Sequence, residues 1–411
     1  MKIRTAFRTF LSLLILFGLF ANTFAQSKVQ KVDPKDQKKN TRPTPKTEEE
    51  LKKEEEERRL REESKNAVTD DEVLTIKTNI VNVDAVVYDK KSGQIITGLK
   101  KENFAIFENG VKQEVSQFAT PDAPITVSLV IEYSKWSEAI GYAANRGYES
   151  GKYEVIRPAA YFLSKFIKPP DDYASVIAFD IRPTPLTDFT NDPNRLRQVV
   201  DLLVRNNPAF RENNLFDSIK FALVGGKGDT VVLENSKEKY QEYGGMVSVK
   251  SKRRAIILVA SGLNTMSRLN YDDVRKVVQS SGIPIYVVGT GNMFFKLYED
   301  RLPATDGVDG TPGRMSFQMA ANYLTTFAKE SGGAYFPVTF ESEVPSVLNS
   351  INALLRNQYS LAYDATDKPK DGKKYKLEVK VDLNGDGIYE EKQLVVQHRP
   401  FYTAEKEKVK K

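Results

Sequence analysis

The chain of 411 residues contains no cysteine, one histidine and one tryptophan. Without cysteine it can form no disulfide framework, thiolate metal site or cysteine nucleophile. The single histidine, His398, excludes a site built from several histidines, and no Gly-x-Ser-x-Gly elbow or phosphate-binding loop accompanies it. We therefore expect a protein that is not an enzyme. Catalysis by two carboxylates is the open alternative, with Asp180 and Asp188 near predicted strand ends, where loop hydrogen bonding would explain them equally well.

The chain also lacks a strong excess of one charge: it has 61 Lys and Arg and 55 Asp and Glu, for a net charge of +6. Three of the basic residues lie in the first eight positions, and residues 74–411 carry 45 basic against 41 acidic side chains. So small an excess does not favour nucleic acid or anionic lipid as a partner.

The one long apolar run is at the N-terminus. Residues 1–25 combine basic side chains, the apolar stretch Phe10–Phe20 and small residues that end at Ala25, the pattern of a cleaved signal peptide. The stretch is too short to span a bilayer as a mature helix. We expect export to the periplasm or beyond, with no stable membrane insertion after cleavage; a retained signal anchor is the alternative.

Residues 26–73 have almost no residues suited to a core and carry 13 basic and 14 acidic side chains. Such a segment cannot bury enough apolar surface to offset its chain entropy, so it is predicted to be a disordered charged tether. It could act as a spacer or simply as a flexible linker. Residues 404–411 are predicted to form a charged tail.

The rest of the chain divides by its hydrophobic pattern. Residues 74–122 alternate apolar and polar side chains and predict a small β module, and residues 358–403 predict a β-hairpin segment. Between them, residues 123–357 alternate buried-strand runs with helical periods, interrupted by a glycine-rich and charged insertion, 225–254, expected to be exposed. This alternation predicts an α/β fold: a Rossmann-like open, mostly parallel sheet with helices on both faces. The strands are expected at 126–132, 174–179, 255–260 and 283–288, and the helices at 155–166, 192–204, 215–223, 271–279, 315–329 and 343–355.

Several segments resemble a von Willebrand factor type A domain. They are the strand Val127–Ile131 with the following EYSKWS loop, LTDFTND at 186–192, NNLFDSI at 213–219 and AIILVASG at 255–262. The flanking segments, 97–118 and the late QYSLAYDATDKPKDGKKYKLEVKV with HRPFY, are similar to those of the VWFA-related secreted proteins first noted in acidobacteria. The likeness covers about residues 74–403 and implies a protein-interaction module of the adhesion type.

The resemblance also implies a position for a metal-ion-dependent adhesion site. The family pattern places an Asp-x-Ser-x-Ser loop after the first strand, a Thr before the third helix and an Asp after the fourth strand. Here Glu132 and Ser134 occupy the first loop, the Thr position falls on Asn213, and the last Asp falls on Ser261. Glu132, Ser134 and Asn213 are thus the residual metal ligands that the resemblance assigns.

Two oxygen positions of this site are lost and a cation, Lys135, lies in its first loop, which should weaken divalent binding. We expect a degenerate site, no cofactor or at most Mg²⁺ or Ca²⁺, and a protein partner bound through the surface. Trp136 is the candidate anchor for that partner, although its ring could also fold over the vacant site as local core. A divalent-cation-dependent adhesion or sensor module is the alternative function.

A second candidate cation site lies in the turn that begins at Asp382. Asp382, Asn384 and Asp386 supply oxygens at alternate positions and Gly387 follows, as in the first half of a calcium loop. The twelfth position is Gln393 rather than Glu, and strands rather than helices are predicted on either side. A hairpin turn rich in Asn, Asp and Gly explains the same residues.

Overall fold

The computed structural model describes residues 80–135, 155–206, 208–227, 242–308, 310–365 and 371–404. The predicted signal peptide, 1–25, and the predicted tether, 26–73, lie outside the described residues. Trp136 and residues 405–411 also lie outside the described residues, and the latter make up nearly all of the predicted charged tail, 404–411.

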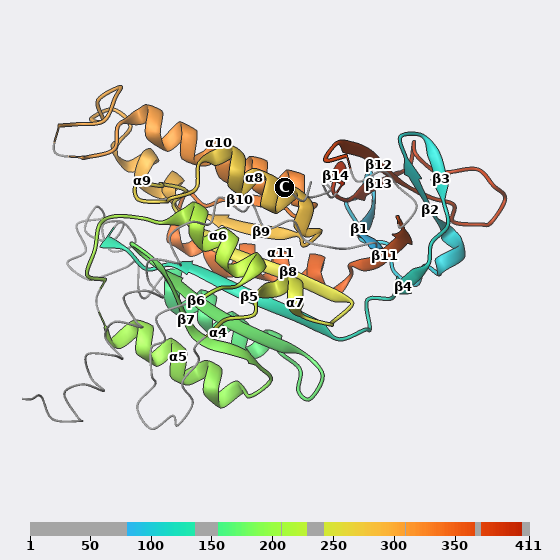
Figure 1. The fold of residues 1–411 in the computed structure, drawn as a ribbon, viewed down its shortest axis with the longest axis horizontal. Helices are drawn as coiled ribbons and strands as arrows, with labels where there is room; N and C mark the ends of the chain where they lie inside the picture. The colour runs from blue at the N-terminus through green and yellow to red at the C-terminus, as the bar shows by residue number, and fades with distance from the viewer. Residues whose placement is uncertain are drawn as a thin grey trace, which may run out of the picture. The chain divides into compact units, whose positions relative to one another are not determined.

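A six-stranded sheet forms the centre of the α/β domain (Figure 1). Its strand order is β10-β9-β8-β5-β6-β7, and neighbours pair in parallel except for the antiparallel pair of β6 and β7. This is a doubly wound order, in which the chain starts in the middle and builds outward on both sides. The α/β fold class with an open, mostly parallel sheet is confirmed. The strands are β5 (Ile125–Glu132), β6 (Tyr173–Phe179), β7 (Pro183–Thr190), β8 (Arg253–Ala260), β9 (Ile285–Gly289) and β10 (Tyr335–Pro337).

Helices cover both faces of this sheet (Figure 1). The central strand β5 is buried along its whole length, because Leu129 faces one core and Val130 faces the other. Burial on both faces explains why the strand reads as a continuous apolar run. One core is closed by α4 (Arg157–Phe166), α5 (Pro193–Arg205) and α11 (Val344–Arg356), and the other by α6 (Leu215–Val224), α8 (Tyr271–Ser281) and α10 (Arg314–Ser331).

Local signals in the sequence set the ends of several helices. The Asp192 side chain accepts a hydrogen bond from the Asn194 N–H at 2.8 Å and Pro193 opens α5, as the Asp-Pro pair predicted. Gly332 ends α10 in the left-handed conformation with a φ of 89°. The six predicted helices are all present, with ends that differ from the expected ones by a few residues.

Four strands and α-helices of the described α/β domain were not predicted: β7, β10 and the short helices α7 (Gly245–Ser248) and α9 (Gly291–Tyr298). Strand β7 contains Pro183 and Pro185, which lack the N–H that a central strand needs. It lies at the edge of the sheet, where a missing donor is tolerated. Strand β10 has only 3 residues, too few to give an alternating pattern.

The segments before and after the α/β domain together form one β module. Two four-stranded sheets, in the orders β13-β1-β11-β4 and β14-β12-β2-β3, each combine strands from both segments. Their inner faces share a core in which Val83 and Leu361 meet Ile106 and Val379. The α/β domain is thus an insertion between β4 and β11. The strands are β1 (Ile80–Asp89), β2 (Phe104–Glu108), β3 (Val111–Gln113), β4 (Gln117–Ala119), β11 (Tyr359–Asp364), β12 (Lys374–Val381), β13 (Leu394–Gln397) and β14 (Phe401–Thr403).

The expectation that the insertion 225–254 is exposed is wrong for its described C-terminal half. Two of its residues are buried in the core: Tyr243, and Met246 within the short helix α7. The Tyr243 ring stacks on Phe221 with centroids 5.2 Å apart, and its hydroxyl lies 2.8 Å from Ser175 Oγ. An aromatic anchor therefore draws this glycine-rich segment back onto the domain. Residues 228–241 lie outside the described residues.

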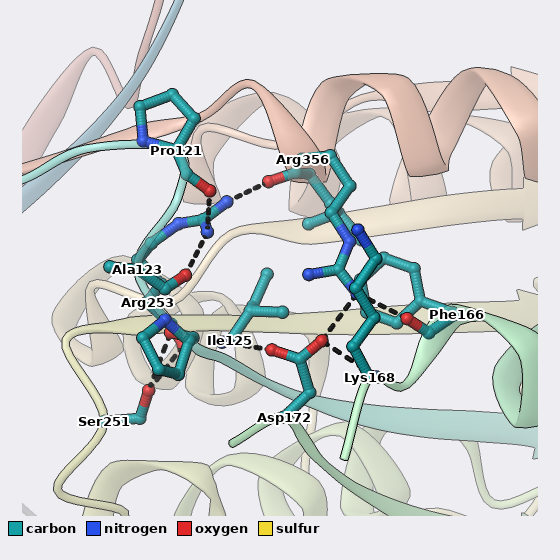
Figure 2. Close-up of polar contacts among 11 residues, drawn as sticks. Pro121, Ala123, Ile125, Phe166, Lys168, Asp172, Ser251, Arg253 and Arg356 are labelled. Carbon is teal, nitrogen blue, oxygen red and sulfur yellow. Dashed lines mark hydrogen bonds and ion pairs between the residues drawn. The ribbon is translucent and has the colours of Figure 1, made fainter. Parts of the chain in front are cut away.

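A buried arginine, Arg253, fixes the two chain crossings between the β module and the α/β domain (Figure 2). The Arg253 guanidinium is fully buried and donates to the carbonyl of Pro121 at 2.6 Å, as well as to those of Ala123 and Leu355. Pro121 and Ala123 lie in the crossing from β4 to β5, whereas Leu355 lies just before β11. One side chain at the start of β8 thus holds both crossings.

Arg356 adds an ion pair to the same junction, 2.6 Å from Asp172 (Figure 2). Asp172 also accepts the N–H of Ile125, the first residue of β5, at 3.0 Å. Through these contacts the end of α11 is bonded to the start of the central strand. Among the described helices, none is long and apolar enough to cross a membrane.

Candidate functional site

Three loops meet at the carboxyl edge of the parallel sheet. Glu132 is the last residue of β5 and Ser261 follows β8. Asn213 lies just before Asn214, the N-cap residue of α6. Because β5 and β8 are parallel neighbours, their carboxyl ends lie side by side at this edge. The structure thus brings together Glu132, Ser134 and Asn213, the residual site residues assigned from the sequence.

The Glu132 carboxylate is enclosed by hydrogen-bond donors. Its side chain is only 4% exposed. Oε1 accepts Ser134 Oγ–H and Asn213 Nδ2–H, each at 2.8 Å, and Oε2 accepts the backbone N–H of Ser261 at 2.6 Å. These short bonds to an ionised acceptor are of the stronger, charge-assisted kind. Both carboxylate oxygens are therefore engaged within the protein.

Asn213 is held from the other side by the loop after β8. Its N–H donates to Thr265 Oγ1 at 2.8 Å, and its carbonyl accepts the N–H groups of Thr265 and Met266, each at 2.9 Å. These three bonds fix the Asn213 backbone, and because the Glu132 carboxylate can only accept, the side-chain amide turns its NH₂ toward it. Asn213 Oδ1 is then left buried and without a hydrogen-bond donor from any described residue.

The same loop also ties down the first turn of α6. Asn264 Oδ1 accepts the N–H groups of Leu215 at 3.1 Å and Phe216 at 3.3 Å. Ser267 Oγ accepts the Phe216 N–H at 3.0 Å and donates to Asn214 Oδ1. These side chains satisfy the free donors at the helix start. None of Asn264, Thr265 and Ser267 was among the site residues assigned from the sequence, although their position shortly after a buried strand was a usable signal.

The first loop is anchored through its backbone. Tyr133 N–H donates to the Phe179 carbonyl at 2.7 Å, and Lys135 N–H donates to the Phe210 carbonyl at 2.8 Å. Lys135 itself is exposed at the rim. Trp136, the predicted partner anchor, lies outside the described residues.

As arranged, these residues do not fit a divalent cation. Mg²⁺ and Ca²⁺ require converging oxygen ligands, whereas Asn213 and Ser261 turn N–H groups toward Glu132. Within the described ranges, no group of three or more His, Cys, Asp or Glu side chains is placed to hold a metal ion. Among the described residues of this site, Asn213 Oδ1 is the one feature that favours a cation, since a buried oxygen without a donor could accept from water or bind a cation.

The second candidate cation site is a hydrogen-bonded turn between β12 and β13. Asp382 Oδ1 accepts the Gly385 N–H at 2.7 Å and Oδ2 accepts the Gly387 N–H at 2.8 Å. Asp386 accepts the Ile388 N–H at 2.7 Å and the side-chain amide of Asn384 at 3.0 Å. Asp382, Asn384 and Asp386 thus bind their own loop, the role that short polar side chains take in tight turns.

His398 lies in the β module and both of its ring nitrogens are bonded. Nε2 accepts the Val379 N–H at 3.3 Å, and Nδ1 lies 2.7 Å from the Arg399 carbonyl, to which it must donate. Burial lowers the pKa of His398 below 6.5. The ring is neutral and held in one tautomer, a structural use of the chain's single histidine. Asp188, one of the two carboxylates considered for catalysis, accepts its neighbour Phe189 N–H at 2.8 Å.

Several solved structures resemble this chain over part of its length. A von Willebrand factor type A protein from Catenulispora acidiphila matches over 78% of this chain and 76% of its own, with 9% identity and a TM-score of 0.39. The vWF domain of the type V pili tip protein Mfa5 from Porphyromonas gingivalis matches over 58% of this chain and 96% of its own, with 14% identity and a TM-score of 0.37.

Proximal thread matrix protein 1 from the mussel byssus matches over 60% of this chain, with 11% identity and a TM-score of 0.37. The match spans only 50% of the mussel protein's own length. These similarities are low in identity and in TM-score, so the fold class rests on the strand order and orientation described above. No protein-family model and no curated protein matches the chain.

Proposed function

We propose that this chain is an exported, non-enzymatic protein-interaction module of the adhesion type, and that it binds a protein partner at the carboxyl edge of its sheet without a divalent cation. The observation that carries this proposal is the bonding of Glu132, whose carboxylate accepts hydrogen bonds from Ser134, Asn213 and Ser261. Hydrogen-bond donors of the protein itself therefore lie at the position where the family resemblance would place a cation.

The energetics favour this substitution of donors for an ion. A buried carboxylate without a partner is costly, and a cation or several hydrogen bonds can offset that cost. Binding a cation here would require turning the Asn213 amide and breaking its bond to Glu132. It would also leave the Ser261 N–H facing the ion. Each lost bond to the carboxylate costs about 1.5–3 kcal/mol.

Exposed apolar side chains, one of them next to the site, support a protein partner. Met266, Met315 and Met319 are each about half exposed, and Leu297 on α9 is similarly exposed. Met266 is fixed next to the site through its N–H bond to the Asn213 carbonyl. Flexible thioether side chains suit contact surfaces that adapt to a partner. The balanced charge of the chain gives no comparable support for nucleic acid.

Export is supported by the signal-peptide pattern of residues 1–25. It can be tested by mass spectrometry of the protein recovered from the native exterior fraction. A mature N-terminus at Gln26 is expected. Recovery of the uncleaved chain in the membrane fraction would instead favour the retained signal anchor.

The alternative function, a divalent-cation-dependent adhesion or sensor module, is favoured by the buried Asn213 Oδ1 that no described residue donates to. Calorimetric titration of the chain with Mg²⁺, Mn²⁺ and Ca²⁺ separates the two. We expect no saturable heat with any of the three ions. Saturable binding that is abolished by Ser134→Ala, and unchanged by the exposed control Ser350→Ala on α11, would establish the alternative.

Partner capture tests the same proposal independently. The immobilised chain is incubated with the native exterior fraction, once with Mg²⁺ and once with a chelator. Equal recovery of bound protein is expected under both conditions, with a loss for Trp136→Ala. Recovery that depends on Mg²⁺ would contradict a cation-independent surface, and equal recovery with Trp136→Ala would remove that side chain from the binding surface.

A further inference from the structure

A cavity of about 230 Å³ lies between α5, the strands β6 and β7 and the loop residue Tyr133 that follows β5, on the sheet face opposite α6. It is partly open to the surface. Engineered apolar cavities of about 150 Å³ already take up a benzene-sized molecule, so this one has room for a ligand of that class. Its walls are Tyr133, Ala178, Phe179, Asp180, Thr184, Leu186, Leu202, Leu203 and Asn206.

Most of the wall is apolar and pre-formed. Leu186 and Leu203 are buried in the domain core. The Tyr133 hydroxyl closes one side, because it donates to the Leu203 carbonyl at 2.9 Å and to that of Asn206. The tyrosine therefore presents its ring rather than a free hydroxyl. An apolar cavity with a few polar groups is the usual form of a small-molecule site.

The polar groups of the cavity favour a positive charge. Asp180 follows β6, and its carboxylate accepts backbone N–H groups of its own loop, among them that of Arg182 at 3.4 Å, with the Arg182 charge also nearby. These partners all lie in the chain beside Asp180, and a carboxylate has further acceptor positions for a ligand in the cavity. Burial raises the pKa of Asp180 above 3.8, the shift that a cationic ligand would reverse.

The end of α5 adds to this preference. The helix ends at Arg205 and its C-cap, Asn206, lines the cavity together with Leu202 and Leu203 from the last turn. The C-terminus of a helix carries a partial negative charge that attracts cations. The charge of the Asp180 carboxylate and the partial negative charge at the end of α5 therefore both favour a cation in this cavity.

We propose that this cavity binds a free small primary amine with a short apolar or aromatic body, the ammonium group paired with Asp180 and the body among Ala178, Leu186 and Leu202. The site is separate from Glu132, so it does not depend on the proposed interaction function. Thr184, half-buried on β7, lies at the cavity wall and its hydroxyl can accept from the same ammonium group.

The test uses the full chain and two probes of equal size, benzylamine and benzyl alcohol, with binding followed by calorimetry and by ligand-observed NMR. A charge-assisted bond to a carboxylate should make benzylamine bind about tenfold more tightly than the alcohol. Asp180→Asn should remove this preference and leave the alcohol affinity unchanged. The exposed Asp300→Asn is the matched control and should behave as wild type.

A second variant tests the cavity itself. Thr184→Phe places a ring in the cavity from the edge strand, where a larger side chain is tolerated better than in the core, and should abolish binding of both probes. Thermal unfolding of each variant verifies that it is folded. Equal affinities for the two probes, an unchanged preference in folded Asp180→Asn, or no saturable binding of benzylamine at millimolar concentration would each overturn the proposal. Binding of a lysine-containing peptide but not of benzylamine would overturn it as well.

Discussion

Asn213 Nδ2 donates a hydrogen bond of 2.8 Å to Glu132 Oε1 across the carboxyl edge of the sheet. The bond joins the end of the central strand to the residue before the α6 cap. It places an amide donor against a carboxylate that is also bonded by Ser134 and Ser261. A site with this donor set gains stability from its own hydrogen bonds, and its behaviour on substitution should differ from that of a cation site.

Glu132→Gln should destabilise the chain. The substitution keeps the size of the side chain but removes the charge and replaces one acceptor oxygen with an NH₂ group. This group either opposes the Ser261 N–H or requires the Ser134 hydroxyl and the Asn213 amide to turn and accept from it. The loss of the charged acceptor, or a buried donor left without a partner, costs about 1–3 kcal/mol. Urea unfolding should show this loss in the free energy of unfolding. The exposed Glu212→Gln is the control, and an equal effect of the two substitutions would mean that the Glu132 bonds contribute little.

Asn213→Asp should create a cation dependence that the wild type lacks. A second carboxylate beside Glu132 removes a donor and adds like-charge repulsion, so the variant should unfold at a lower temperature without divalent ions. Two adjacent carboxylates can share a divalent cation, and a ligand that binds the folded state stabilises it by mass action. The melting temperature of Asn213→Asp should rise with millimolar Mg²⁺ or Ca²⁺ while that of the wild type stays constant. A rise in the wild type would support a functional cation site.

Much of this architecture could be predicted from the sequence because it depends on burial. Strands such as Val127–Ile131 are apolar at every position since both sheet faces are covered, and parallel topology then brings Glu132 near Ser261. The direction of each hydrogen bond could not be predicted. It depends on the loop after β8, where Thr265 fixes the Asn213 backbone, and on the Glu132 carboxylate, which only accepts and so meets the NH₂ of the amide.

Other features depend on contacts between distant segments. Strand β7 contains two prolines that argue against a strand unless its edge position is known. Tyr243 lies in a glycine-rich segment and is buried only because Phe221 and Phe189 stack against it. The single β module likewise results from pairing between β1 and β11, whose residues are far apart in the chain.

Arg253→Met should destabilise the whole described fold. Methionine keeps the apolar stem but removes the guanidinium that donates to Pro121, Ala123 and Leu355. The buried Leu355 and the half-buried Pro121 and Ala123 would lose the donor to their carbonyls, so the expected loss is on the order of 3 kcal/mol. Urea unfolding monitored by far-UV circular dichroism gives the value, with the exposed Arg197→Met as control. An unchanged midpoint would mean that the two crossings do not depend on this side chain.

The turn at Asp382 should be stabilised by its own hydrogen bonds rather than by calcium. Asp382→Ala leaves the Gly385 and Gly387 N–H groups without their acceptor and should cost about 1–2 kcal/mol. The loss should be the same with and without Ca²⁺. A wild-type melting temperature that rises with Ca²⁺, and no longer does so in Asp382→Ala, would identify a calcium loop.

Acid should weaken the β module through His398. Burial lowers the pKa of its ring below the 6.5 of the unfolded chain; the Arg399 charge acts in the same direction, whereas the hydrogen bond to the Arg399 carbonyl and the Glu378 carboxylate oppose it. A group whose folded pKa is depressed stabilises the fold fully above its unfolded pKa, and this contribution is lost as the pH falls toward the folded pKa. Protonation would also place a donor on Nε2, opposite the Val379 N–H that it now accepts.

The chain's only histidine makes this contribution separable from that of the carboxylates. The free energy of unfolding is measured against pH for wild type and for His398→Gln, which is neutral throughout, and the difference between the two profiles isolates the ring. We expect a constant difference above about pH 7 that shrinks as the pH falls below 6.5, since only the wild type must keep an imidazole uncharged. Parallel profiles down to pH 5 would mean that the His398 pKa is the same in the folded and unfolded chain, and the buried, doubly bonded ring would then not be pH-sensitive.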